Sequence, residues 1–152
     1  MFDLDGVLAD VRHRLHFLEQ VPKDWDGFFG AIPTDPLLEA GQALAAELAK
    51  THEIVYLTGR PERTRSTTSA WLSEGRLPPG RLVMRRDGDH RPARLTKVGL
   101  ARRLGADQAI AVIVDDDPAV CAALRAEGLP VLAADWVDRP ETLNREQEHG
   151  RT

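Results

Sequence analysis

The stretch FDLDGVLAD at residues 2–10 places two aspartates, Asp3 and Asp5, directly after a short apolar start. Their spacing of two residues puts both side chains on one side of the chain where the backbone is extended. A buried central strand usually has about five or six residues, whereas only Met1 and Phe2 precede Asp3. Two interpretations remain open: a clipped first strand, or a natural chain that begins upstream of Met1.

Downstream of this stretch, short apolar runs alternate with segments of helical period, a pattern that is typical of an α/β fold. We predict a three-layer, Rossmann-like domain with a central parallel sheet of about five strands and helices on both faces. The expected strands are Met1–Leu4, Glu53–Leu57, Leu82–Met84, Ala109–Val114 and Val131–Leu132. The expected helices are Pro36–Lys50, Pro61–Ser73, Leu95–Leu104 and Pro118–Glu127.

The length of 152 residues suits one packed domain, which we assign to residues 1–137. The segment Val7–Pro33 has no single period and is expected to form a flap with a short helix. Within it, Trp25, Phe28 and Phe29 have the spacing of a helix face, which favours packing onto the core over base stacking. The polar tail at residues 138–152 is expected to be frayed or disordered.

The composition restricts the class of protein. A net charge of −4 and a pI near 5.7 argue against general coating of nucleic acid, so any such contact must be local. The chain has no apolar run of membrane length and no apolar leader, so we expect a cytoplasmic enzyme without a membrane partner. Its one cysteine, Cys121, excludes an intramolecular disulfide and is expected to be a buried helical thiol.

Polar residues follow the predicted strands or open the next helix. Thr58 follows the second strand, Lys97 opens a helix, and the aspartates at 115–117 follow the apolar run AVIV at 111–114. In an open parallel sheet, ligands bind beyond the carboxyl ends of the strands. These residues are therefore expected to gather with Asp3 and Asp5 in one site.

The expected gathering of carboxylates indicates a metal site. Two carboxylates at about 4 Å repel each other by roughly 4 kcal/mol at an effective dielectric of about 20, unless a cation lies between them. Ligands that are all oxygen favour Mg²⁺, which also pairs with phosphate. A remaining aspartate can act as a nucleophile, and a threonine hydroxyl and a lysine ammonium can hold phosphoryl oxygens. The pattern predicts phosphoryl transfer.

Four segments, FDLDGVLAD, YLTGR at 56–60, Lys97 and VIVDD at 112–116, resemble the four motifs of the haloacid dehalogenase (HAD) superfamily. The resemblance implies that Asp3 is the nucleophile and that Asp5 is the general acid and base. It further implies that Thr58 and Lys97 bind phosphoryl oxygens. Mg²⁺ would be held by Asp3, the backbone carbonyl of Asp5, and Asp115 or Asp116.

The spacing of the motifs leaves little or no room for a cap domain. About fifty residues separate Asp5 from Thr58 and about forty separate Thr58 from Lys97, and each gap already contains a predicted helix. Small-substrate enzymes of this type often close a lid over the site, whereas an open site can admit a phosphate at the end of a macromolecule.

A narrower resemblance is carried by HRLHFL, KDWDGFF, TGRPERTR, TSAWL and LVMRRDGDHRP. These segments are similar to the 3′-phosphatase module of bacteriophage polynucleotide kinase/phosphatase and of related phage and bacterial proteins. The resemblance implies that Arg14 and Arg60 help bind the substrate phosphate, and we also assign Gly59, which lies between Thr58 and Arg60, to substrate binding. The stretch GDHRPARLTK at 88–97 matches that family's G-D-x-R-x-D-x-x-x-K, except that Ala93 replaces an aspartate and removes a carboxylate from the rim of the site.

Arginines of the segment from 76 to 94 are open to two interpretations, a path for a phosphate backbone or a solvated face. We assign three of them, Arg85, Arg86 and Arg91, to substrate binding, while Arg76, Arg81 and Arg94 are further candidates for the path.

The expected function is Mg²⁺-dependent removal of phosphate from polynucleotide 3′ ends, on single-stranded DNA or RNA, during nucleic-acid end repair. The expected partners are this phosphorylated substrate and, where the enzyme is joined to one, a kinase or ligase. Two alternatives remain open. One is a small-molecule phosphatase such as a 5′(3′)-deoxyribonucleotidase, since enzymes of that kind also contain the motif DGVLAD. The other is a binding domain that kept the fold and lost catalysis.

Overall fold

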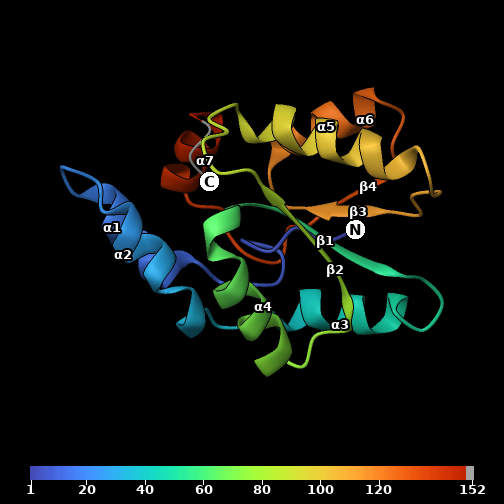
Figure 1. Cartoon of the computed structure of the whole chain (residues 1–152), viewed down its shortest axis with the longest axis horizontal. Helices are drawn as coiled ribbons and strands as arrows, with labels where there is room; N and C mark the ends of the chain where they lie inside the picture. The colour runs from blue at the N-terminus through green and yellow to red at the C-terminus, as the bar shows by residue number, and fades with distance from the viewer. Residues whose placement is uncertain (150–152) are drawn as a thin grey trace.

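The computed structural model describes residues 1–149 and contains parallel strands between layers of helices (Figure 1). Strand β1 (Ile54–Pro61) pairs in parallel with β2 (Gly80–Arg85), and β3 (Ile113–Asp115) pairs in parallel with β4 (Val131–Ala133). Phe2 forms isolated parallel bridges to Tyr56 of β1 and Val114 of β3, so the start of the chain lies between the two pairs. The predicted α/β class is confirmed.

The predicted sheet of about five strands is not confirmed, because the described residues form four strands in two pairs. The segment Met1–Leu4 contributes only the bridges at Phe2. Directly after it the chain turns, since the carbonyl of Leu4 accepts hydrogen bonds from the backbone N–H groups of Val7, Leu8 and Ala9. This turn ends the extended path before Asp5 can continue a ladder.

Helices cover both sides of the strands, as the sequence predicts. Figure 1 shows α3 (Glu39–Leu48) and α4 (Arg65–Glu74) on one side and α5 (Ala93–Gly105) and α6 (Pro118–Ala126) on the other. Helix α6 begins at the proline because Asp117 caps it, with a carboxylate oxygen that accepts from the N–H of Ala119 at 2.8 Å. A 3₁₀ turn, η3 (Glu62–Thr64), precedes α4, so the α-helix begins later than predicted.

The segment expected to form a flap contains two short α-helices, α1 (His16–Glu19) and α2 (Trp25–Gly30), and two 3₁₀ turns, η1 (Arg12–Arg14) and η2 (Ile32–Thr34). Phe28 and Phe29 of α2 are buried, with ring centroids 5.2 Å apart in an edge-to-face arrangement. The predicted core packing is confirmed for these two rings.

The tail differs from its prediction. Helix α7 (Glu141–Glu148) forms within the segment expected to be frayed, and Leu143 on it is buried. Glu146 is also buried and pairs with Lys23, which anchors the helix to the segment between α1 and α2. A polar sequence can form an ordered helix where one apolar residue and a few paired charges face the domain. Residues 150–152 lie outside the described residues.

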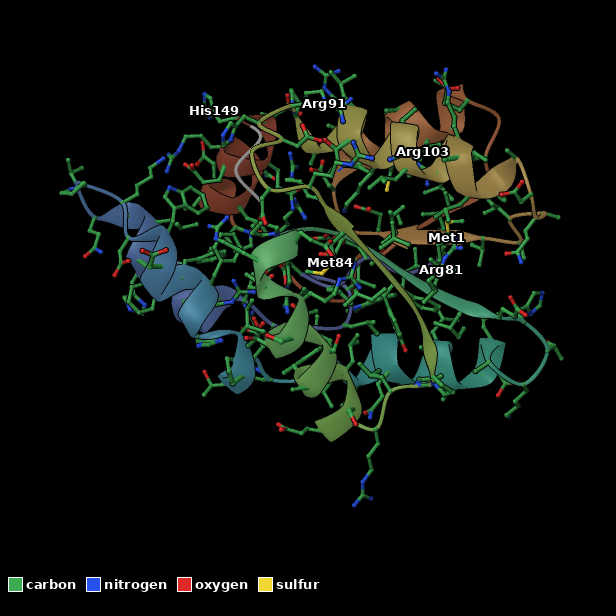
Figure 2. All side chains as sticks on the ribbon, in the orientation of Figure 1. Met1, Arg81, Met84, Arg91, Arg103 and His149 are labelled. Carbon is green, nitrogen blue, oxygen red and sulfur yellow. The ribbon has the colours of Figure 1, made fainter. Side chains whose placement is uncertain are left out.

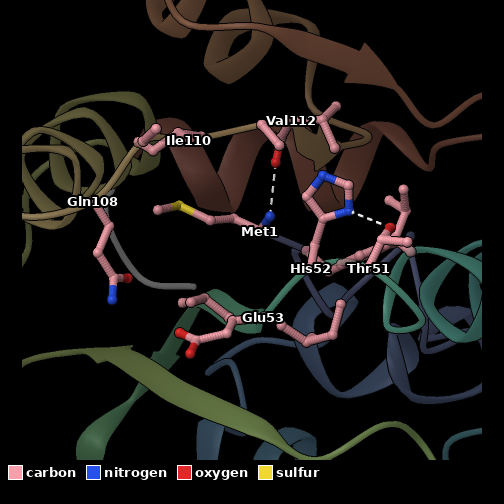
Figure 3. A pocket seen from close by; sticks show the side chains of 13 residues that line it. Met1, Thr51, His52, Glu53, Gln108, Ile110 and Val112 are labelled. Atoms are coloured by element: carbon pink, nitrogen blue, oxygen red, sulfur yellow. Dashed lines mark hydrogen bonds between the residues drawn. The ribbon is translucent and has the colours of Figure 1, made fainter.

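At the amino ends of the strands, a cavity of about 360 Å³ lies between Met1, Ile54 and Ile110 (Figure 3). The α-ammonium group of Met1 donates to the carbonyl of Val112 at 2.7 Å, and burial lowers its pKa to about 6. None of the residues assigned to the predicted site lines this cavity. Within residues 1–149, no helix combines the length and apolar character that a membrane crossing requires.

Candidate active site

Three aspartates converge at the carboxyl ends of the strands. Asp3 follows the bridging residue Phe2, Asp115 ends β3, and Asp116 follows it. One carboxylate oxygen from each of the three lies within 4.8 Å of the others, and all three side chains are buried. The sequence predicted this convergence, and the parallel strands produce it by ending at one edge.

Lys97 reaches this cluster from the first turns of α5. Its Nζ lies 2.7 Å from Oδ2 of Asp3 and 2.7 Å from Oδ2 of Asp115. Burial alone would favour the neutral amine, but the two carboxylates raise the pKa of Lys97 above its ordinary value. The side chain is therefore a fixed cation between the two aspartates.

The three carboxylates carry more negative charge than Lys97 can balance. Burial, together with the neighbouring aspartates, raises the pKa of Asp3, and burial raises that of Asp116 to about 6 although Arg139 opposes this shift. In the described part of the chain, Oδ1 of Asp3 and Oδ1 of Asp116 are buried without a hydrogen-bond partner. Unpaired buried carboxylate oxygens of this kind fit a divalent cation that prefers oxygen ligands, as Mg²⁺ does.

Arg139 occupies the other side of Asp116 and was not predicted from the sequence. Its guanidinium donates to Oδ2 of Asp116, to Oδ2 of Asp117 at 3.3 Å, and to the side chain of Gln147 in α7 at 2.7 Å. No local signal marks this arginine, because it lies in the segment that was expected to be frayed. Within residues 1–149, Oδ1 of Asp116 has no hydrogen-bond donor.

Asp5 belongs to a neighbouring cluster of arginines. Its Oδ1 accepts from Nε of Arg60 at 2.8 Å and from a terminal nitrogen of Arg14 at 3.1 Å. Burial disfavours the charged carboxylate, yet the guanidinium groups of Arg60 and Arg14 outweigh it and lower the pKa of Asp5. The side chain of Asp5 is thus not one of the three converging carboxylates, although it follows Asp3 by two residues.

Asp35 holds the two arginines in place and was missed by sequence reasoning. Arg14 contacts it through Nε at 2.7 Å, Arg60 through a terminal nitrogen at 2.7 Å, and His13 through Nε2 at 2.8 Å. All of these groups except His13 are buried. The only local signal, a carboxylate directly before Pro36, is also typical of an ordinary helix start.

Thr58, Gly59 and Arg60 lie at the carboxyl half of β1, which runs longer than predicted. The hydroxyl oxygen of Thr58 accepts from the N–H of Arg60 at 3.2 Å, and the carbonyl of Gly59 accepts from Nε of Arg85 at 3.1 Å. Tyr56 pairs with Phe2, so Asp3 comes one residue and Thr58 two residues after this pair on neighbouring segments. Thr58 is buried, and its role in holding a phosphoryl oxygen stays a prediction.

The arginines assigned to substrate binding after β2 differ in their surroundings. Arg85 is buried and donates to the carbonyls of Asp89 at 3.0 Å and of Arg91 at 2.7 Å, so it organises the loop rather than facing solvent. Arg86 is exposed. Arg91 lies at the surface near the start of α5 and pairs with Asp89 at 2.7 Å (Figure 2).

The arginines from 76 to 94 do not all lie at one end of β2. Arg81 lies at the start of β2, at the opposite end from Arg85. Arg94 is 3.5 Å from Glu148 of α7. Ala93, which replaces the aspartate of the resembled pattern, is buried as the first residue of α5.

Comparison with known proteins identifies a related family. The family model HAD_PNKP, described as the polynucleotide kinase PNKP phosphatase domain, matches residues 1–138. A solved structure titled "Structure of Pnkp1/Rnl/Hen1 complex" is similar with a TM-score of 0.73 at 21% identity, and covers 91% of this chain and 45% of that chain. A second, titled "Structure of the Pnkp1/Rnl/Hen1 RNA repair complex", has a TM-score of 0.66 at 22% identity, with 91% and 42% covered.

These structural likenesses show the fold. The chain spans less than half the length of either solved chain. No curated protein matches the chain significantly in sequence.

Proposed function

The chain belongs to the family of polynucleotide kinase PNKP phosphatase domains, and from this membership we propose that it removes phosphate from polynucleotide 3′ ends with the help of Mg²⁺. The family makes the chain a phosphatase. The observation that carries the finer proposal is the cluster of Asp3, Asp115 and Asp116 around Lys97, with two buried carboxylate oxygens that lack a hydrogen-bond partner in the described chain. Such a site suits the charge of a phosphoryl group and its metal.

In the proposed first step, a carboxylate oxygen of Asp3 attacks phosphorus and the bond to the leaving oxygen breaks. Asp5 gives its proton to that oxygen, and the phosphoryl group stays on Asp3 as an acyl phosphate. In the second step, a water molecule attacks the phosphorus and Asp5 takes the water's proton. The bond between phosphorus and the Asp3 oxygen breaks, so inorganic phosphate leaves and the Asp3 carboxylate is restored. Thr58 and Lys97 would hold the phosphoryl oxygens throughout.

The metal would be held by the carboxylates of Asp3 and of Asp115 or Asp116, together with the backbone carbonyl of Asp5. When bound, Mg²⁺ would neutralise phosphate charge and orient the phosphoryl group. Lys97 and Arg139 support this arrangement, since they engage the Oδ2 atoms of these aspartates and leave Oδ1 of Asp3 and of Asp116 without a hydrogen-bond partner in the described chain.

Asp5 needs a proton for the first step, while its arginines favour the ionised form. We propose that the substrate changes this balance. A phosphate dianion bound beside Arg14 and Arg60 would draw their charge away from Asp5 and place a second negative group near it, and both effects favour protonation. The arginines would thereby couple binding of phosphate to the acid form of Asp5.

The proposed substrate is a polynucleotide because the family is that of polynucleotide kinase phosphatase domains, and a fold relative is titled an RNA repair complex. We include RNA and DNA ends. The two short helices α1 and α2 leave no large cap in the described chain, which supports an open site. We also propose that this phosphatase works together with a kinase or a ligase.

A comparison of substrates tests the proposed specificity. We expect a higher kcat/KM for an oligonucleotide with a 3′ phosphate than for the same oligonucleotide with a 5′ phosphate or for nucleoside monophosphates, because only the first presents the proposed end. An aryl phosphate, which needs little help from a general acid, serves as the control for an intact site. Faster turnover of the mononucleotides would instead assign a small-molecule phosphatase.

Removal of divalent ions should abolish activity on every substrate, because crowded carboxylates and a phosphate cannot approach without a cation. Ca²⁺ should inhibit, since its bonds to oxygen are about 2.3–2.6 Å long against about 2.0–2.1 Å for Mg²⁺. Mg²⁺ should also raise the thermal midpoint of the wild-type protein, and raise it less in Asp116→Asn. Full activity in excess chelator would contradict the proposed metal site, and an equal midpoint shift in both proteins would assign Asp115 rather than Asp116 as the ligand.

A further inference from the structure

A second cleft adjoins the site and has no part in the proposed phosphoryl transfer. It has a volume of about 440 Å³, within the range of about 300–1,000 Å³ that is common for small-molecule sites. Helix α2 forms one wall, and the loop after β2 forms another. Pro61, which also lines the cleft, directly follows Arg60 of the arginine cluster.

The wall from α2 is aromatic. Trp25 and Phe29 both line the cleft, with ring centroids 5.9 Å apart and ring planes inclined by 31°. Phe29 is buried, whereas Trp25 is only half-buried. The Trp25 side chain therefore packs partly against the core and leaves part of its surface exposed where it lines the cleft.

The remaining walls carry cationic and polar groups. The guanidinium of Arg63 lies 5.1 Å from the centre of the Phe29 ring, and Arg86 and His90 are exposed at the loop. Arg63 also has a weak ion pair with Asp87 at 3.8 Å. A cleft with an aromatic wall and arginines at its rim combines the two groups that bind single-stranded nucleic acid, one for the flat face of a base and one for phosphate.

Hydrogen bonds also join the loop of the cleft to the site. Arg85 donates to the carbonyl of Gly59, next to Thr58, and to the carbonyl of Asp89 in the cleft's loop. One buried side chain thus ties the loop to the segment that would hold the phosphoryl oxygens.

We propose that this cleft binds a nucleobase at the 3′ end of the substrate, with Trp25 as the stacking surface and Arg63 and Arg86 near the adjoining backbone. The inference rests on the proposed function, because it names where a base lies when its phosphate is beside Asp3. It assigns to the cleft a preference for a strand end that carries a base over one that does not. An acidic peptide could form ion pairs with the arginines, but it would not supply a flat ring to stack on the aromatic wall.

Binding can be measured without turnover in the Asp3→Asn background with Mg²⁺ present. The probes are two fluorescent oligonucleotides with a 3′ phosphate, which are identical except that the terminal two nucleotides of one are abasic. We expect about tenfold weaker binding of the abasic probe, because it lacks the base that would stack on the aromatic side chain. Trp25→Ala should remove that difference, and Trp25→Phe should retain most of it.

Arg81→Ala, at the other end of β2, is the matched control and should leave the difference intact. The thermal midpoint of each variant shows whether it folds. If Trp25→Ala does not fold, the affinities of the parent and of Trp25→Phe for the two probes still test the subsite. Equal affinity of the parent for both probes, or a difference that survives in folded Trp25→Ala, overturns the subsite. Failure of the proposed function would look different: the wild-type protein would not release phosphate from the 3′ end, whatever the probes show about base-dependent binding.

Discussion

Asp3→Asn is expected to reduce turnover to below about 1% of the wild-type rate on every phosphomonoester, because an amide keeps the shape of the side chain and lacks a nucleophilic oxygen. The fold should survive the change. Asp3 is buried and its pKa is raised by burial and by the neighbouring aspartates, so a neutral side chain is tolerated there. Lys97 keeps Asp115 as its partner. Steady-state rates and a thermal midpoint for the same preparation check both parts.

Asp5→Asn is the matched comparison, since it removes a carboxylate two residues away without removing the proposed nucleophile, Asp3. We expect this variant to be slowest on alkyl phosphates and less impaired on an aryl phosphate, whose leaving group needs no proton. An Asp3→Asn protein that retains several per cent of the activity would remove Asp3 from the nucleophile's role. Equal losses on both kinds of leaving group in Asp5→Asn would contradict its role as the general acid.

Asp35→Asn is expected to lower the free energy of unfolding by about 3 kcal/mol, because the removal of one partner from a buried ion pair typically costs about 3–5 kcal/mol. The side chains of Asp35, Arg14 and Arg60 are fully buried, so water cannot replace the lost charge. Asp5 remains as a partner of both arginines and keeps the expected loss at the lower end of that range. Urea denaturation monitored by circular dichroism measures the change.

Asp87→Asn provides the control, because that carboxylate is half-exposed and lies 3.8 Å from the exposed Arg63. Its effect should be below about 1 kcal/mol, as for other surface pairs. Asp35→Asn should also raise the KM for phosphate esters, since Arg14 and Arg60 lose the group that orients them. If the two variants had equal stability, the buried network would not be a stabilising unit of this fold.

The order of strands and helices was predictable because it depends on neighbours in the chain. Alternating apolar runs and helical periods indicated β1, α5 and α6, and their ends were placed within a few residues. Residue types at the ends of the strands indicated the cluster of Asp3, Lys97 and Asp115, since parallel strands bring such ends together. The first strand was less predictable, because the turn at Leu4 depends on backbone hydrogen bonds that no period reveals.

The sequence by itself determined the α/β class, the strand-end aspartates and the lysine that joins them, because these follow from local period and residue type. Only the tertiary structure decided which charges meet. Asp35 pairs with arginines 21 and 25 residues away, and Lys23 with Glu146 across 123 residues, which organises a tail that had seemed too polar to fold. Arginine side chains usually lie at the surface, whereas Arg85 is buried and donates hydrogen bonds to backbone carbonyls. Desolvation explains these outcomes: a buried charge takes whichever partner the folded chain brings within reach, and sequence distance does not specify that partner.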